Sequence, residues 1–211
     1  MGVWKKIEPP SLNDDEKSVQ VKTTITRHEI RRATSEIALE KELTWHFEKG
    51  ACYHCFSWGD VDSLTYFRVI VKQQRIRYAL ISTWGMAETD IKEIFSWIEK
   101  GYIGRVDFYV GEIFKGSYEK EYRLLVELCG KYGCRLVIFR NHSKIMLLFG
   151  EKFDAAIESS ANVNTNPRSE QTVITVDSQL AFWYKDIFDN ITPFNSDFEQ
   201  PPILDLTRKS D

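Results

Sequence analysis

The feature that most constrains the fold of this chain is a regular alternation of strand-like and helix-like segments in its central part. Apolar runs at 77–82 and 105–110 are typical of buried strands, and each is followed by apolar residues at helical spacing. The first helical segment covers 87–100, and the second ends near Gly133. A strand followed by a helix is therefore repeated as a β-α unit.

The second half of the chain contains a cluster of strand candidates with short connections. They are the segments 135–139, 144–149, 154–160 and 172–176, and a helical segment at 179–191 follows them. Strands that alternate with helices and then gather together predict an α/β fold with a mixed β-sheet sandwiched between helices.

The secondary structure of the N-terminal part rests on fewer sequence patterns. Residues 18–26 resemble a strand, 28–43 a helix and 51–58 another strand. Residues 1–20 are polar and contain Pro9-Pro10, which is typical of a flexible arm. Residues 195–211 have the composition of a second tail, although their "PPILDL" stretch could dock on the domain.

These assignments predict one domain over residues 21–194, with a core at 78–191 and an N-terminal extension at 21–58. A chain of 211 residues with 43% hydrophobic residues is long enough to bury a substantial core in one such domain. The formal net charge of −3 gives no overall field that would draw the protein to a polyanion, so any nucleic-acid contact requires a local patch.

The sequence contains no secretion signal and no apolar run of 18 residues, so we expect an intracellular, cytoplasmic protein without membrane contact. Its four cysteines are Cys52, Cys55, Cys129 and Cys134, which are too few for a disulfide scaffold and are expected to be reduced.

A histidine and a lysine stand two positions apart in "NHSKIMLLF", where an apolar strand begins. In an extended strand, His142 and Lys144 point to the same side and Ser143 to the other. A neutral imidazole can act as a nucleophile near neutral pH, and an ammonium beside it can neutralise a phosphate oxygen. A pair of this kind without other support is usually solvated surface.

A second polar cluster, "ESSANVNTNPRSEQ", follows after one further strand. Ser160 and Asn162 share a side if extended, and both can donate hydrogen bonds to phosphate. Glu170 could orient a histidine through its second ring nitrogen. Arg168 could bind a neighbouring backbone phosphate with two parallel hydrogen bonds.

The order of these residues resembles the phospholipase D superfamily, whose members carry the HKD motif. The matching residues are His142 and Lys144 in "HSK", Ser160 and Asn162 in "SSAN", and Glu170. The resemblance covers roughly residues 78–191. It departs from the family pattern at Phe149, where the family has the Asp of its motif, and at Ser159, where it has Gly.

The motif occurs once, and single-motif members of the family form their active site by homodimerisation. The resemblance therefore implies a homodimer in which two copies of His142 face each other across a two-fold axis. One would attack phosphorus and the other would protonate the leaving oxygen. Lys144 and Asn162 would hold the phosphate, Glu170 would orient the imidazole, and Ser160 and Arg168 would bind substrate. No metal or other cofactor is implied.

Other interpretations compete at several positions. Cys52, His54 and Cys55 with His46 could be half of a zinc site, but Cys129 and Cys134 have unsuitable spacing for the other half, and an apolar strand explains the first cysteines as well. The basic runs "RHEIRR" and "KQQRIR" are more typical of solvated faces than of nucleic-acid contacts. Trp58, Trp84 and Trp97 are expected in a core or an interface.

The sequence therefore predicts a metal-independent phosphodiesterase, with a nuclease as the preferred assignment and DNA preferred over RNA as the substrate. The preference for nucleic acid follows from the resemblance of single-motif soluble members to endonucleases. Two alternatives stay open. One is a catalytically inactive nucleic-acid-binding or assembly protein with the same fold, and the other is a lipid or small-phosphodiester hydrolase.

Overall fold

The computed structural model describes residues 37, 39, 43, 47–58, 61–163 and 168–206. The predicted arm at 1–20 and the predicted strand at 18–26 lie outside these residues, as does the helix predicted at 28–43 apart from its three described positions. Within the described part, the predicted α/β class is confirmed.

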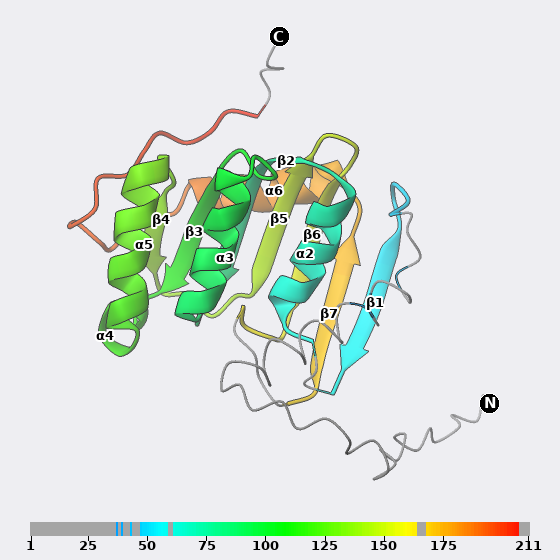
Figure 1. Ribbon diagram of the computed structural model, residues 1–211, viewed down its shortest axis with the longest axis horizontal. Coiled ribbons are helices and arrows are strands. Elements are labelled where there is room, and N and C mark those ends of the chain that lie inside the picture. The colour runs from blue at the N-terminus through cyan, green and yellow to red at the C-terminus, as the bar shows by residue number, and fades with distance from the viewer. Residues whose placement is uncertain are drawn as a thin grey trace.

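One mixed sheet of seven strands forms the centre of the molecule, in the order β1-β7-β6-β5-β2-β3-β4 (Figure 1). The three strands β2, β3 and β4 are parallel, and β5 joins β2 antiparallel and begins the antiparallel half of the sheet. The strand bounds are β1 Cys52–Ser57, β2 Ile76–Thr83, β3 Val106–Gly111, β4 Leu136–Phe139, β5 Ile145–Gly150, β6 Asp154–Ser159 and β7 Glu170–Thr175.

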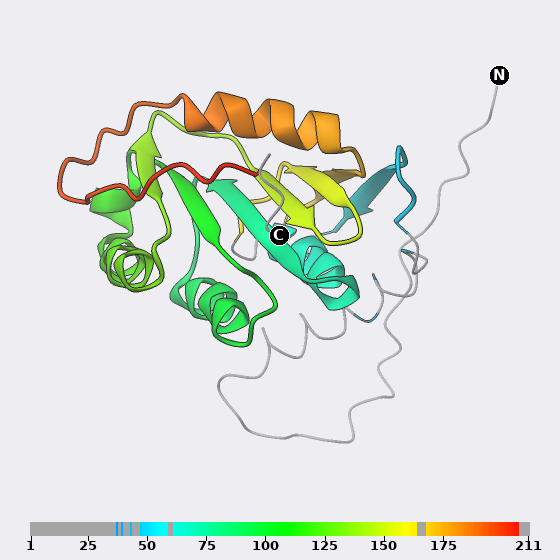
Figure 2. The same cartoon turned by 90° about the horizontal axis from the view of Figure 1, so that it is seen from above.

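Helices cover both faces of the sheet, as Figure 2 shows from above. On one face lie α2 (Ser63–Gln73), α3 (Glu88–Glu99), the short α4 (Phe114–Ser117) and α5 (Glu119–Tyr132). The opposite face carries α6 (Ser178–Asp189). Since α3 connects β2 to β3 and α5 connects β3 to β4, the repeated β-α unit predicted from the sequence is present.

Strand β5 illustrates how alternation in the sequence builds two cores. Met146 and Leu148 face the larger core under α2, α3 and α5, whereas Leu147 and Phe149 face a smaller core under α6. A strand buried on both faces has no polar side, which explains why "KIMLLF" is an unbroken apolar run.

Helix α2 was not predicted from the sequence. Every residue from Ser63 to Val71 is buried, so the segment has no polar stripe to reveal a helical period. The helix is nevertheless marked at its start, because Asp62 accepts a hydrogen bond from the backbone N–H of Thr65 at 2.9 Å.

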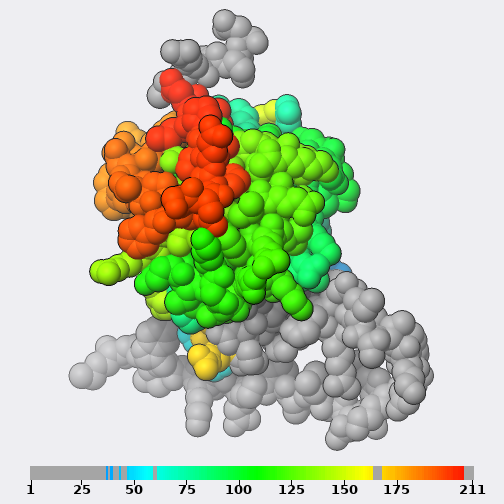
Figure 3. All heavy atoms as spheres, turned by 90° about the vertical axis from the view of Figure 1, so that its left-hand side faces the viewer, coloured from blue at the N-terminus to red at the C-terminus, as the bar shows by residue number. Residues whose placement is uncertain are grey.

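The C-terminal segment follows the outer edge of β4, and Figure 3 shows it lying over that side of the molecule. The backbone N–H of Phe194 donates to the carbonyl of Ile138 at 2.7 Å, and the Asn195 side chain accepts from the Ile138 N–H and donates to the Leu136 carbonyl. Leu204 and Leu206 then pack against the smaller core. These contacts satisfy backbone groups that an open sheet edge would leave unpaired.

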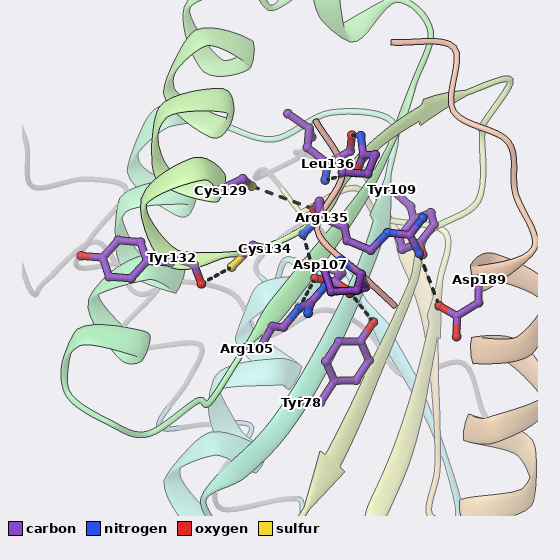
Figure 4. Close-up of polar contacts among 12 residues, drawn as sticks. Tyr78, Arg105, Asp107, Tyr109, Cys129, Tyr132, Cys134, Arg135, Leu136 and Asp189 are labelled. Atoms are coloured by element: carbon purple, nitrogen blue, oxygen red, sulfur yellow. Dashed lines mark hydrogen bonds and ion pairs between the residues drawn. The ribbon is translucent and has the colours of Figure 1, made fainter. Parts of the chain in front are cut away.

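A buried polar cluster joins this edge to α6 (Figure 4). Asp107 is fully buried and accepts hydrogen bonds from the Tyr78 hydroxyl, the Arg105 side chain and the Arg135 backbone N–H. Arg135 continues the cluster toward α6 through an ion pair with Asp189 at 3.8 Å. The charges compensate one another inside the domain, which is what the burial of an aspartate requires.

All four cysteines are free thiols. Cys129 and Cys134 are buried, and burial raises the pKa of both, to about 11 for Cys134. Within the described ranges, none of the helices combines the length and the apolar character needed to cross a membrane.

Candidate active site

His142 and Lys144 lie in the loop that connects β4 to β5, at the end of the sheet where β2 and β3 finish. The Lys144 Nζ lies 3.2 Å from His142 Nδ1 and 2.7 Å from the His142 carbonyl oxygen. The two side chains are therefore on the same side of the loop. Ser143 points to the other side, where its hydroxyl lies 2.7 Å from that of Ser82 on β2.

The side chain of Asn141 holds this loop against the ends of β2 and β3. Its side-chain amide is buried and donates to the Ser82 hydroxyl at 2.9 Å and to the Tyr109 carbonyl at 3.0 Å. Its side-chain oxygen accepts from the backbone N–H and the hydroxyl of Ser143 at 2.8 and 2.7 Å. The amide thus joins the ends of β2 and β3 to the residue between His142 and Lys144.

Trp84 follows β2 directly and contacts the imidazole of His142. The ring centroids are 5.6 Å apart and the planes make an angle of 61°. Gly111 makes this position possible, because a Cβ there would lie 2.9 Å from the Trp84 ring and 2.9 Å from the Asn141 carbonyl. Trp84 and Asn141 contribute to the site but were not among the predicted site residues.

Ser160 and Glu170 are brought together from the end of β6 and the start of β7. The Ser160 hydroxyl donates to the Glu170 carboxylate and accepts from the backbone N–H of Gln171 at 2.9 Å. The carbonyl of Lys144 accepts from the backbone N–H of Ser159 at 3.0 Å, which ties this pair to the loop of His142. The predicted hydrogen bond from His142 to Glu170 stays a prediction.

Asn162 and Arg168 flank residues 164–167, which lie outside the described part of the chain. The Asn162 backbone carbonyl accepts from the Ser63 hydroxyl at 2.9 Å, which attaches this loop to the start of α2. The Asn162 Oδ1 is buried and lacks a hydrogen-bond partner among the described residues. Arg168 is exposed.

An open hollow of about 430 Å³ lies between the loop of His142 and the end of β6. Residues 142–145 line one side and residues 158–160 line the other. His142, Lys144 and Ser160 therefore border one space. We refer to it as the first hollow.

The charge of Lys144 is affected by this position. Burial lowers the pKa of Lys144 below its ordinary value, and the Glu170 carboxylate offsets part of that shift. An ammonium that has lost part of its hydration gains more from a neighbouring anion than one in bulk water does. Lys144 can therefore bind an anion at its side of the first hollow, whose other side includes the Glu158 carboxylate.

Phe149 is far along β5 from the histidine and outside the first hollow. It is fully buried, and its ring packs against Tyr78 and against Phe182 of α6, with centroids 5.8 and 5.0 Å apart. Phe149 is thus part of the smaller core.

The candidate zinc ligands that the structure describes, Cys52, His54 and Cys55, are not placed to hold a metal. The described residues contain no group of three or more His, Cys, Asp or Glu side chains placed to hold a metal, and His46 lies outside them. His54 is exposed on β1, where its ring nitrogen lies 3.6 Å from the Cys52 sulfur.

Two of the basic residues in "KQQRIR" lie at the opposite end of the sheet from His142. Arg75 pairs with Glu151 at 3.6 Å, and Arg77 pairs with Asp154 at 3.6 Å, both beside the turn between β5 and β6. The "RHEIRR" run lies outside the described residues. Of the three tryptophans expected in a core or interface, Trp97 is buried and Trp84 is half-buried, but Trp58 is 76% exposed.

Comparison with known sequences gives no match, either to a protein-family model or to a curated protein. Solved structures do match. Polyphosphate kinase from Porphyromonas gingivalis has a TM-score of 0.52 and 16% identity over 71% of this chain, and the chain spans 27% of that protein.

Two further matches have TM-scores of 0.48. TrmBL2, an archaeal chromatin protein, is 11% identical over 76% of this chain, which spans 59% of it. NucT from Helicobacter pylori is 15% identical over 65% of this chain, which spans 94% of it. At these identities a structural match describes the fold, and of the three only polyphosphate kinase exceeds a TM-score of 0.5. Together with the mixed seven-stranded sheet and its helices on both faces, that match shows that this chain has a phospholipase D-like α/β fold.

Proposed function

We propose that this protein is a metal-independent phosphodiesterase that cleaves nucleic acid, DNA in preference to RNA, through a phosphohistidine intermediate in a homodimeric active site. The observation that carries the proposal is the first hollow. It places the imidazole of His142 and the ammonium of Lys144, 3.2 Å apart, opposite the Ser160 hydroxyl that is bound to Glu170.

Each residue has a chemical task in this proposal. His142 supplies the nucleophilic ring nitrogen, and Lys144 neutralises a non-bridging phosphate oxygen. Asn162 donates hydrogen bonds to the phosphate, and Ser160 donates its single proton to the phosphate in exchange for its bond to Glu170. Arg168 binds an adjacent phosphate of the backbone. Glu170 holds the imidazole in the tautomer that leaves its attacking nitrogen unprotonated.

A second copy of the chain supplies the missing acid. The reaction requires one imidazole to attack and another to donate a proton, and among the described residues that line the first hollow there is one histidine, His142. The other histidine within the described ranges, His54, contacts Cys52 on β1 instead. A two-fold axis close to His142 would bring two equivalent imidazoles to one phosphate.

The reaction proceeds in two steps. In the first, His142 attacks phosphorus, the N–P bond forms, and the bond from phosphorus to the leaving oxygen breaks. That oxygen takes a proton from His142 of the second copy. In the second step, this neutral imidazole takes a proton from water, the resulting hydroxide attacks phosphorus, and the N–P bond breaks. The products are an alcohol and a phosphate monoester.

The test is cleavage of labelled single-stranded and double-stranded DNA and RNA by the purified full chain in EDTA. We expect cleavage, loss of at least 1,000-fold in rate for His142→Ala, and a covalent adduct on His142 that is stable to alkali and labile to acid. His54→Ala is the matched control, because it removes another exposed histidine of the same domain; it should cleave at the rate of the original protein.

The alternatives give different results in the same experiment. Binding of nucleic acid without cleavage by either protein would contradict catalysis and support an inactive binding protein. Hydrolysis of lipid or of a chromogenic diester, with nucleic acid left intact, would contradict the proposed substrate. A monomer in sedimentation at the enzyme concentration that gives activity would contradict the shared site.

A further inference from the structure

Two exposed aromatic side chains lie at the end of β1, next to the candidate site. Phe56 is 63% exposed and Trp58 is 76% exposed, and their rings contact each other edge to face with centroids 5.2 Å apart. Large aromatic side chains usually bury most of their surface. An exposed pair in mutual contact is therefore a candidate for binding another molecule.

Strand register places this pair beside the site. Phe56 is paired with Gln171 of β7. The Gln171 carbonyl accepts a hydrogen bond from the Ser160 backbone N–H at 2.9 Å, and the Gln171 backbone N–H donates to the Ser160 hydroxyl, also at 2.9 Å. Ser160, Gln171 and Phe56 thus form a row across three neighbouring segments. The row covers about two strand spacings, or roughly 10 Å.

The same register decides which face Phe56 occupies. On β1, Tyr53 and Cys55 pack against the larger core, so Phe56 points to the opposite face. Ile174 of β7 also packs against the larger core, so Gln171 and Val173 share the face of Phe56. Phe56 and Gln171 are therefore neighbours on one open side of the sheet.

A second hollow of about 340 Å³ lies on this side, lined by Glu158, Ser159, Ser160, Gln171 and Val173. It shares residues 158–160 with the first hollow. A ligand can therefore extend from His142 and Lys144, past Ser160 and Gln171, to Phe56 and Trp58 without leaving the surface. We refer to this path as the aromatic track.

We propose that the aromatic track binds an unpaired nucleic-acid strand, with a base of the nucleotide next to the scissile phosphate stacked on Trp58 or Phe56. This proposal rests on the proposed function and narrows its substrate to single strands. A base can stack on these ring faces only when it is unpaired and free to leave the base stack of a duplex. Stacking is tolerant of sequence because every base has a flat π-face. The track therefore gives a preference for single strands over duplexes and no preference for base sequence.

The two ends of the track match the two parts of a nucleotide. Lys144 offers a positive charge to a phosphate at one end, and two aromatic rings offer stacking to a base at the other. The roughly 10 Å between Ser160 and Phe56 fits a phosphate and a base of neighbouring nucleotides in an extended strand.

Binding of a fluorescein-labelled oligothymidine to the full chain in EDTA tests the proposal, with a duplex of equal length as the comparison. We expect Phe56→Ala and Trp58→Ala each to weaken binding of the single strand by about 5- to 100-fold and to leave duplex binding within about twofold. Trp58→Phe keeps a ring and should keep most of the affinity. The matched control is Phe194→Ala, because Phe194 is 60% exposed at the opposite edge of the sheet, beside β4.

Three results would overturn the proposal. Binding of the single strand could be unchanged in Phe56→Ala and Trp58→Ala, or these variants could lose equal affinity for single strand and duplex. The third result is a lowered mass of the dimer in sedimentation, which would assign the aromatic pair to self-association.

Hydrolysis of bis-p-nitrophenyl phosphate separates this proposal from the proposed function. That small diester binds at the His142 end of the track and is too short to extend to Phe56 and Trp58, so its His142-dependent turnover should be equal in all these variants. If turnover is absent in every protein, the proposed function fails; if turnover persists and the aromatic variants bind normally, the track alone fails.

Discussion

The indole of Trp84 lies edge to face against the imidazole of His142, with ring centroids 5.6 Å apart and planes at 61°. The contact joins the end of β2 to the loop before β5, two segments separated by 58 residues in the chain. Gly111 at the end of β3 leaves room for the indole, because any side chain there would collide with it. The histidine orientation is thus set partly by the ends of the two parallel strands.

Replacing Trp84 should therefore affect catalysis more than substrate binding. We expect Trp84→Ala to lower kcat of the proposed phosphodiesterase by about 2- to 10-fold, since an aromatic contact of this kind contributes about 0.5–1.5 kcal/mol. Trp84→Phe should restore much of the loss. Steady-state kinetics with a chromogenic diester provides the measurement, and Trp183→Ala on α6 is the control. A rise in KM with kcat unchanged would show that Trp84 acts on binding instead.

Asn141 should be required for both stability and the shape of the loop. Its buried amide makes hydrogen bonds to Ser82, Tyr109 and Ser143, and Asn141→Ala leaves several of these groups without a partner. We expect the free energy of unfolding to fall by about 1–3 kcal/mol in urea denaturation. Asn190→Ala is the matched control, because Asn190 is exposed at the end of α6, and it should change stability by less than about 0.5 kcal/mol. Equal effects of the two substitutions would contradict the role of the amide.

Segments with a clear period in the sequence were predicted well. The strands and helices from 77 to 191 follow the predicted order, because alternation of 2.0 and 3.6 residues reflects which faces are buried. Helix α2 was missed for the same reason, since nearly all of its residues are buried and it has no polar face. Polar composition around 195 gave no sign that Asn195 would pair with β4, whereas the apolar residues of "PPILDL" at 201–206 did allow the docking that Leu204 and Leu206 make.

The candidate site was only partly visible in the sequence. His142 and Lys144 are two residues apart, so strand geometry alone places them together. Trp84 and Phe56 reach the site through the pairing of strands far apart in the chain, β2 with β5 and β1 with β7. Pairing of this kind is fixed by the whole sheet and leaves no local pattern, which explains why neither residue was predicted at the site.

The lowered pKa of Lys144 leads to a prediction about pH. Burial lowers this pKa and Glu170 raises it, so Glu170→Gln should lower it further. If activity requires the ammonium, activity declines as pH rises through the pKa, and the alkaline limb of the pH profile should move to lower pH in Glu170→Gln. Titration of the lysine ¹³Cε resonances by NMR measures the pKa directly. A limb that moves to higher pH would contradict this account, and Lys144→Arg, whose guanidinium stays charged, should have no such limb.

Phe149 stands where the sequence departs from the motif that it resembles. Phe149→Asp would remove that departure, yet it would place a carboxylate in the smaller core, between Tyr78 and Phe182. Loss of the buried ring alone costs about 3–5 kcal/mol, and an unpaired buried charge adds to that. We therefore expect Phe149→Asp to be strongly destabilised in urea denaturation and to gain no activity, whereas Phe149→Leu, which keeps an apolar side chain, should remain folded and active. A stable Phe149→Asp variant with raised phosphodiesterase activity would contradict the assignment of this position to the core.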